Sequence, residues 1–198
     1  MAASGLAGGP GGSPDGRAGE DARAVAAALA GAQAGFDALM HAHREAVFRM
    51  VRGHLGNEAD ALDVTQDSFV AAFLALGRYD SARSFRAWLL RIALNKCRDW
   101  ARRRAVRRLL AFALPMEEAA GVADEAPGPE ALLASRQEVA RINAAIAALP
   151  DALKEPLLLC AVEGLPQDEA AAILGIGRKA VETRIYRARR KLSHLVEG

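Results

Sequence analysis

Apolar residues recur at intervals of three and four positions through most of the chain, the spacing that places side chains on one face of an α-helix. The first such stretch starts at Phe36 and ends near Gly53 and Gly56. The second, from about Glu58 to Leu76, has a predicted buried stripe of Leu62, Phe69, Phe73 and Leu76. The third, at about 85–108, carries the apolar residues Phe85, Trp88, Leu89, Ile92 and Ala93. The pattern predicts three successive amphipathic helices.

The same periodicity returns nearer the C-terminus. An alanine-rich helix is expected at 131–148, with apolar positions Leu132, Val139, Ile142 and Ile146. After Pro150, a helix at about 152–163 ends at Gly164, and a short helix opens with Pro166 in its first turn. A turn at Gly175-Ile176-Gly177 leads to a last helix from about Arg178, with an inward stripe of Val181, Ile185, Ala188 and Leu192. Helix, short glycine-bearing turn and helix is the pattern of a helix-turn-helix.

Two segments interrupt the helical pattern. Residues 1–22 contain seven glycines and two prolines among small residues, which predicts a disordered tail. Residues 113–130 hold three prolines, two glycines and five acidic residues, which predicts a flexible acidic linker. We therefore predict an all-α protein with two small helical domains at 23–110 and 132–198. A flexible linker at 111–131 joins them, and the C-terminal domain is a helix-turn-helix.

The net charge of +2 conceals a strong segregation of charge along the chain. Residues 83–108 and 175–192 hold 17 of the 26 Lys and Arg residues but only two of the 24 acids, Asp99 and Glu182. Two basic blocks on an otherwise acidic chain suggest two contacts with a polyanion. A solvated helix face is the alternative, but pairing between neighbouring helix positions would normally mix the signs.

The outward face of the last predicted helix has the chemistry of a DNA-reading surface. Its members are Lys179, Thr183, Tyr186, Arg187 and Arg190. A basic recognition helix enters the major groove, where an exposed tyrosine can reach a thymine methyl group or a phosphate. The alternative is a helical bundle whose last helix is basic for no functional reason.

A row of acidic residues occupies one face of the second predicted helix. Asp60, Asp63 and Asp67 lie at i, i+3 and i+7, with Gln66 alongside. A pair of catalytic carboxylates of the glycosidase kind would need a concave site around a substrate, and one helix face provides none. The row is better interpreted as an acidic docking surface.

Other chemistry-bearing residues give no enzyme, cofactor or metal site. His41 and His43 are two positions apart, so on a helix they point to different sides and cannot share a metal. Cys97 and Cys160 lack metal-ligand spacing and are expected to be free thiols in a reducing cytoplasm. No apolar run is long enough for a membrane span. We predict a cytoplasmic protein without membrane insertion and without enzymatic activity.

Taken together, the two halves resemble the extracytoplasmic-function (group IV) sigma factors of bacterial RNA polymerase. DALDVTQDSFVAAFLALGRYD (60–80) is similar to their polymerase-clamp-binding helix. SFRAWLLRIALNKCRDWARRR (84–104) is similar to their promoter-melting helix, and LPDALKEPLLLCAVEGLPQDEAAAILGIGRKAVETRIYRARRKL (149–192) to their region 4. The resemblance implies a factor that binds core RNA polymerase, recognises −35 and −10 promoter elements and assists DNA melting.

For the first half, the resemblance implies both polymerase and DNA contacts. Asp60, Asp63, Gln66 and Asp67 would bind the β′ clamp of core polymerase. A base flipped from the −10 element would be captured by the loop residues Ser81, Arg83, Ser84 and Phe85. Trp88 and Asn95 match positions near the melted strand, although Trp88 can equally belong to the core. Phosphate would be held by Arg102, Arg103 and Arg104.

For the second half, the resemblance implies that region 4 reads the −35 element and contacts the β flap of polymerase. The implied DNA-binding residues are Arg178, Lys179, Ala180, Glu182, Thr183, Tyr186, Arg187 and Arg190. Glu182 departs from the family, in which this position is often Lys or Arg, so no particular −35 sequence is inferred. Family members are often held inactive by an anti-sigma factor, which would be a further partner.

Two other functions are compatible with parts of this pattern. A stand-alone helix-turn-helix regulator would bind DNA without polymerase, but it has no need for the acidic face beside the arginine-rich helix. A sigma-like decoy would bind an anti-sigma factor and not DNA, which the retained arginines argue against.

Overall fold

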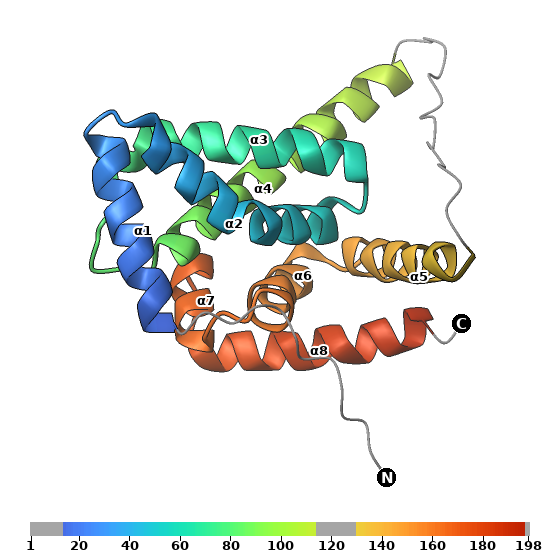
Figure 1. Ribbon diagram of the computed structural model, residues 1–198. Coiled ribbons are helices and arrows are strands. Elements are labelled where there is room, and N and C mark those ends of the chain that lie inside the picture. Colours follow the sequence, from blue (N-terminus) through green and yellow to red (C-terminus); the bar gives the residue numbers. More distant parts are fainter. Residues whose placement is uncertain (1–13, 114–129, 197–198) are drawn as a thin grey trace.

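The computed structural model describes residues 14–113 and 130–196, and within these ranges every regular element is helical, which confirms the predicted all-α class. The first module comprises α1 (Pro14–Leu29), α2 (Gln33–Leu55), α3 (Glu58–Ala75), the 3₁₀ turn η1 (Leu76–Arg78) and α4 (Phe85–Ala113). The second comprises α5 (Glu130–Ala147), α6 (Asp151–Leu157), the π-helical turn η2 (Leu158–Val162), α7 (Gln167–Leu174) and α8 (Arg178–Val196) (Figure 1).

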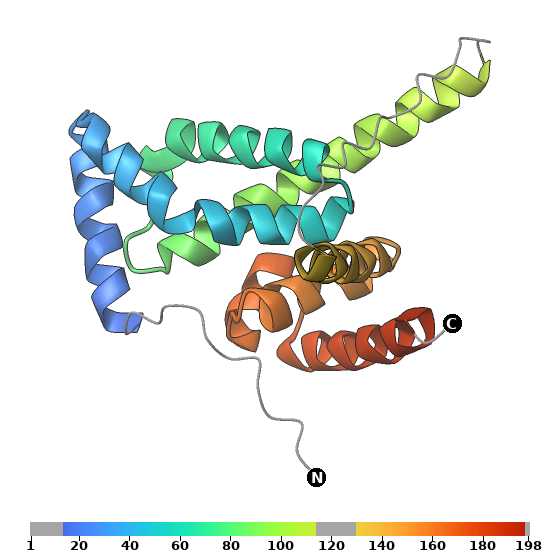
Figure 2. The same ribbon diagram turned by 45° about the vertical axis from the view of Figure 1, so that its right-hand side comes forward.

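The first module is built around α2, α3 and α4, whose apolar faces meet in one core. The largest contributions are Leu39, Val47, Met50, Val51, Val64, Phe69, Leu89, Leu90 and Leu94. Between α2 and α3, Gly56 takes a left-handed φ of 76° and the Asn57 side chain caps α3 by accepting from the Asp60 amide. The C-terminal part of α4 extends beyond this core (Figures 1 and 2).

Helix α1 contradicts the predicted disordered tail from residue 14 onward. The helix begins at Pro14, and its Asp21, Val25 and Ala28 are buried. It crosses α2 at Gly35, where an added Cβ would lie only 2.4 Å from the Ala28 amide nitrogen. Glycine content suggested disorder, but apolar burial against α2 stabilises the helix. Residues 1–13 lie outside the described part of the chain.

The predicted linker is shorter at both ends, because α4 continues to Ala113 and α5 starts at Glu130. Residues 114–129 are not described. Two predicted buried stripes also need correction. Leu62 on α3 is 48% exposed while its neighbour Ala61 is fully buried. On α5, Val139 and Ile142 are exposed, whereas Ile146 is buried.

The second module contains the predicted helix-turn-helix. α7 ends at Leu174 and is followed by Gly175, which adopts a left-handed φ of 67°; α8 starts at Arg178. On α8, Val181, Ile185 and Ala188 are buried and Leu192 is half-buried, as the periodicity predicted. The helix expected at about 152–163 is observed as α6 followed by η2.

The two modules contact each other through ion pairs that the sequence did not reveal. Arg98 on α4 donates to both oxygens of Glu155 on α6, at 2.7 Å and 2.6 Å. The buried Glu163 carboxylate accepts from Arg86 at 2.8 Å and from Arg49 at 3.1 Å. Part of the basic block at 83–108 therefore binds carboxylates of the second module.

Candidate nucleic-acid interface and docking groove

The outward face of α8 presents the basic residues that the sequence analysis selected. Lys179, Tyr186, Arg187 and Arg190 are exposed, and Tyr186 retains 62% of its accessible surface. The Arg190 guanidinium lies 6.0 Å from the centre of the Tyr186 ring. Because a large aromatic side chain on a charged surface exposes apolar area, this face has the composition of a recognition surface.

Contacts along the first turns of α8 organise the other predicted DNA-binding residues. Arg178 lies 3.4 Å from the Asp168 carboxylate of α7, and the Thr183 hydroxyl donates to the Lys179 carbonyl oxygen at 2.8 Å. Ala180, which follows Lys179 in the first turn of α8, is half-buried.

Glu182 is held by Lys179 on the same face. The Lys179 ammonium donates to the Glu182 carboxylate at 2.8 Å and lowers the pKa of Glu182 below its usual value. The carboxylate is therefore ionised at neutral pH and neutralises one of the cations that would otherwise face phosphate. A carboxylate at this position can accept from a cytosine amino group.

The loop between η1 and α4 places its polar residues at the surface. Ser81, Arg83 and Ser84 are all exposed. The Asp80 carboxylate accepts from the Ala82 amide at 3.0 Å, and the Ser84 hydroxyl accepts from the Ala87 amide at 3.3 Å, as expected of an N-cap. Side-chain caps thus define both ends of this turn.

Phe85, which was predicted to line the base-binding pocket, instead packs beneath the loop, next to Trp88, for which both a position near the melted strand and a position in the core were left open. Phe85 is only 2% exposed, so its side chain belongs to the core and is not presented to solvent. Trp88 is half-buried and lies 5.5 Å from Phe85 and 5.3 Å from Tyr79, measured between ring centres. Aromatic side chains provide large apolar contact area, which explains why the sequence pattern alone assigned them two roles.

The remaining predicted DNA-binding residues lie along α4. Asn95 is exposed and accepts from Arg98 at 3.4 Å. Arg102, Arg103 and Arg104 are exposed in the C-terminal half of α4. Arg104 lies 3.5 Å from the Asp60 carboxylate and 4.9 Å from the centre of the Trp100 ring. Asp60, predicted to bind polymerase, is therefore paired within the chain.

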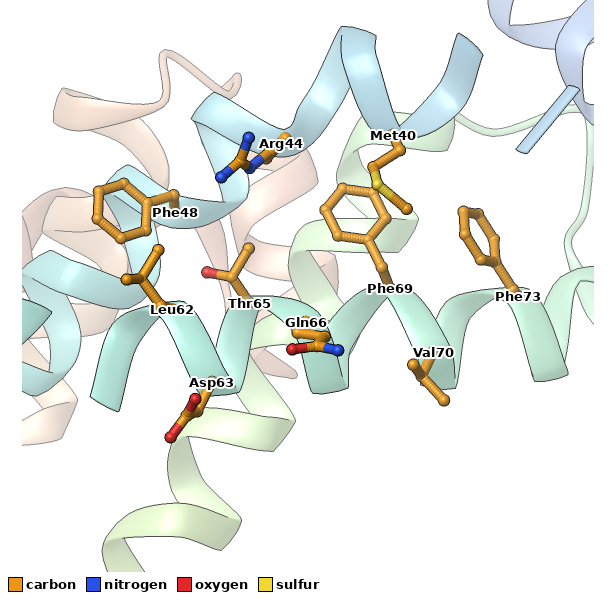
Figure 3. Close-up of a pocket in the computed structure, with 10 residues that line it drawn as sticks. All are labelled: Met40, Arg44, Phe48, Leu62, Asp63, Thr65, Gln66, Phe69, Val70 and Phe73. Carbon is orange, nitrogen blue, oxygen red and sulfur yellow. The ribbon is translucent and has the colours of Figure 1, made fainter. Parts of the chain in front are cut away.

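An apolar groove lies beside the predicted acidic docking surface. Asp63 and Gln66 line it, while Asp67 is exposed but outside it. The groove runs between α2 and α3, has a volume of about 430 Å³, and is otherwise lined by Met40, Arg44, Phe48, Leu62, Thr65, Phe69, Val70 and Phe73 (Figure 3).

The groove itself was not predicted, because its apolar lining residues Leu62, Phe69 and Phe73 were assigned to a buried stripe. Leu62 and Val70, which line the groove, are 48% and 53% exposed, and with Gln66 and the 84% exposed Leu74 they recur at intervals of four along α3. A helix that packs against one core needs only a single apolar stripe, so the second apolar stripe on α3 was the sequence feature that could have indicated a docking groove.

The potential metal ligands and the two cysteines are the other chemistry-bearing residues of the described segments. Among the described residues, no three His, Cys, Asp or Glu side chains are grouped to hold a metal ion. Cys97 is buried and Cys160 half-buried, and both are free thiols. Burial raises the pKa of Cys97 to about 12, which keeps it protonated. None of the described helices is both long and apolar enough to cross a membrane.

Comparison with known proteins gives the family. The model of sigma-70 region 2 matches residues 39–107, and that of sigma-70 region 4 matches residues 140–192. The RNA polymerase sigma factor CnrH of Cupriavidus metallidurans is 46% identical over 166 residues, which cover 82% of this chain and 87% of that protein. The ECF RNA polymerase sigma factor SigE of Mycolicibacterium smegmatis is 35% identical over 79% of this chain and 60% of that protein.

A solved structure of CnrH in complex with the cytosolic domain of CnrY has a TM-score of 0.66 and 37% identity, covering 90% of this chain and 97% of that one. The chain belongs to the sigma-70 family, as an extracytoplasmic-function RNA polymerase sigma factor. Its function is therefore transcription initiation and not that of a stand-alone helix-turn-helix regulator.

Proposed function

We propose that this sigma factor divides promoter recognition between its two modules, with no chemistry of its own. The observation that carries the proposal is the separation of two exposed basic faces, one on α8 and one on the loop and helix at 81–104. The units that correspond to regions 2 and 4 would be residues 14–113 and 130–198, with residues 114–129 joining them.

The α8 face would read the −35 element in the major groove. Tyr186 and Arg187 have the exposure needed to reach base edges, Arg190 would contact phosphate, and Lys179 would position the Glu182 carboxylate. Glu182 would favour cytosine at the base pair that it faces. The remaining members of this proposed surface are Arg178, Ala180 and Thr183.

The first module would bind the melted −10 element. Unstacking a base costs a few kcal/mol, so a captured base needs compensating contacts. Ser81, Arg83 and Ser84 supply exposed polar groups for such contacts. Asn95 and the arginines Arg102, Arg103 and Arg104 would hold the single strand and its phosphates.

The groove between α2 and α3 would dock onto the β′ clamp of core polymerase, and region 4 onto the β flap. An apolar centre with a polar rim is the usual composition of a protein interface. Here Leu62 and Val70 would form the centre and Asp63 and Gln66 the rim, with Asp67 exposed on the same helix outside the groove. Because it would act on core polymerase, the protein would act in the cytoplasm.

A protein inhibitor of the anti-sigma class is a further proposed partner. The matched structure of CnrH contains a second protein, the cytosolic domain of CnrY. An inhibitor that covers the α2–α3 groove of this chain would prevent polymerase binding.

Binding to purified core polymerase tests the docking proposal. Val70→Asp places a charge in the apolar centre and is expected to weaken the complex at least about tenfold, the effect of roughly 1.4 kcal/mol. The matched control is Val139→Asp on α5, a position of similar exposure that lies outside the groove.

Gel filtration and fluorescence anisotropy against core polymerase give the affinities. If both variants bind core polymerase with the same affinity as the wild-type protein, the groove is rejected as the docking surface. Tight binding to a promoter in the absence of polymerase, with a symmetric footprint, would contradict the proposed division of labour.

A further inference from the structure

A buried polar pair connects α1 to the first module. His43 on α2 is 1% exposed, and its Nε2 lies 2.8 Å from Asp21 Oδ1 on α1. An ionised carboxylate can only accept, so the ring N–H donates. Neither residue belongs to the recognition surfaces described above, and residue 21 precedes the part of the chain that matches sigma-70 region 2.

The His43 ring continues into the aromatic cluster beneath the η1–α4 loop. Its centre lies 5.3 Å from that of Phe85, which in turn lies 5.3 Å from Tyr79. Tyr79 precedes the loop and Phe85 follows it, so the cluster holds both ends. The Tyr79 hydroxyl also donates to the Arg83 carbonyl oxygen at 2.5 Å, which fixes the loop from within.

Asp21 also acts on Tyr79 electrostatically. Burial raises the pKa of the Tyr79 phenol, and the negative charges of Asp21 and Asp80 raise it further. The phenol therefore stays protonated and remains a donor to the Arg83 carbonyl oxygen. The Asp21 carboxylate thus acts on the His43 imidazole through a hydrogen bond and on the Tyr79 phenol through its charge.

We propose that Asp21 and His43 are positioning residues for −10 recognition, through the chain Asp21–His43–Phe85–Tyr79 that fixes the loop at 80–84. The inference rests on the proposed function, because it takes this loop to be the base-capturing element. Loss of the Asp21 acceptor leaves a buried imidazole N–H unpaired, and such a group is costly to keep buried. The ring then shifts, and the contacts of Phe85 and Tyr79 shift with it.

A purely structural role for the pair would be limited to holding α1 on α2. That role predicts a loss of stability without any change in promoter preference. The positioning role predicts a change in −10 discrimination at constant −35 recognition. The two roles are separated by measuring promoter preference and stability on the same variants.

The test uses the full chain bound to core polymerase, on a promoter identified by transcription from a genomic library. The measured quantity is the ratio of initiation on that promoter to initiation on versions with single −10 substitutions. Asp21→Ala is expected to lower this ratio about tenfold, the discrimination that one base pair typically supplies. Asp21→Asn keeps an acceptor and is expected to restore most of the ratio. Glu20→Gln, exposed on the same helix, is the matched control.

A spectroscopic signal follows the loop directly. With 5-fluorotryptophan incorporated, the chain gives two fluorine resonances, from Trp88 in the aromatic cluster and from Trp100 farther along α4. Asp21→Ala is expected to shift the Trp88 resonance and leave that of Trp100 in place. If Asp21→Ala fails to fold, His43→Gln tests the same connection from the other partner.

The possible results distinguish the inference from its premise. If Arg83→Ala and Ser84→Ala lower −10 discrimination but Asp21→Ala and His43→Gln do not, the positioning role is overturned and the loop assignment stands. If none of these variants changes −10 discrimination, the loop assignment itself fails, and the positioning role with it. Equal losses on −10 and −35 substitutions would also overturn the proposal.

Discussion

Replacing Glu155 with Gln is expected to weaken the contact between the two modules. Glu155 is 6% exposed, and both of its oxygens accept from Arg98 across the boundary between α6 and α4. His54 Nε2 lies 3.8 Å from Oε1. The substitution preserves the shape of the side chain but removes the charge that balances Arg98.

The size of the effect follows from the pKa of Glu155. Burial alone would raise this pKa, but the contacts with Arg98 and His54 outweigh burial and lower it from 4.5 to about 2. At 1.36 kcal/mol per unit, the depressed pKa corresponds to a contribution of about 3 kcal/mol at neutral pH. Because the folded pKa lies below the unfolded one, the contribution is complete above pH 4.5 and is lost as the pH falls toward 2.

Urea denaturation at pH 7 and at pH 3 measures this contribution. Glu155→Gln is expected to lower the free energy of unfolding by about 3 kcal/mol at pH 7. The difference in this free energy between the variant and the unmodified protein should be smaller at pH 3. Glu138→Gln is the control, because its pair with Arg141 is exposed and the change should stay within about 0.5 kcal/mol. A loss below about 1 kcal/mol for Glu155→Gln, or a loss independent of pH, would refute the reasoning.

Three further predictions concern single positions. Gly35→Val is expected to displace α1, because even a Cβ at this position would lie 2.4 Å from the Ala28 amide nitrogen. Amide hydrogen exchange in α1 should then accelerate, and unchanged protection of these amides would argue against the close crossing of α1 and α2. Tyr186→Ala should weaken binding of the holoenzyme to a −35 duplex by about 1–3 kcal/mol without affecting the binding of core polymerase. Quantitative footprinting measures this loss, and an equal loss of affinity for duplexes with a mutated −35 element would contradict the prediction. Cys97 is fully buried and its pKa is raised to about 12, so it should resist alkylation in the folded chain while Cys160 reacts. Equal alkylation rates of the two cysteines would contradict the burial of Cys97.

Local patterns predicted the helix-turn-helix well because each signal in it is local. Gly175 requires a left-handed φ, and the stripe of Val181, Ile185 and Ala188 needs only helical periodicity. Once the buried stripe of α8 is known, the remaining positions of the helix must form its exposed face. The exposed loop residues Ser81, Arg83 and Ser84 were instead named from the resemblance to the sigma-factor family.

Long-range contacts account for what the sequence did not predict. Helix α1 is stabilised by burial against α2, which glycine content does not report. On α3, Ala61 faces the core and Leu62 faces the groove, because closely packed helices favour the smaller residue. Arg98 was expected only as part of a basic block, and its partner Glu155 is 57 positions away. Pairings over such separations leave no local pattern.

Transcription from a genomic promoter library, with purified core polymerase and the full chain, tests the central claim most directly. Mapping of transcript 5′ ends is expected to give discrete starts that share one motif near −10 and another near −35. Tyr186→Ala should relax the −35 motif alone, and Arg83→Ala the −10 motif alone. Initiation no greater than with core polymerase alone, or starts without shared upstream motifs, would contradict the assignment of this chain as a promoter-reading sigma factor.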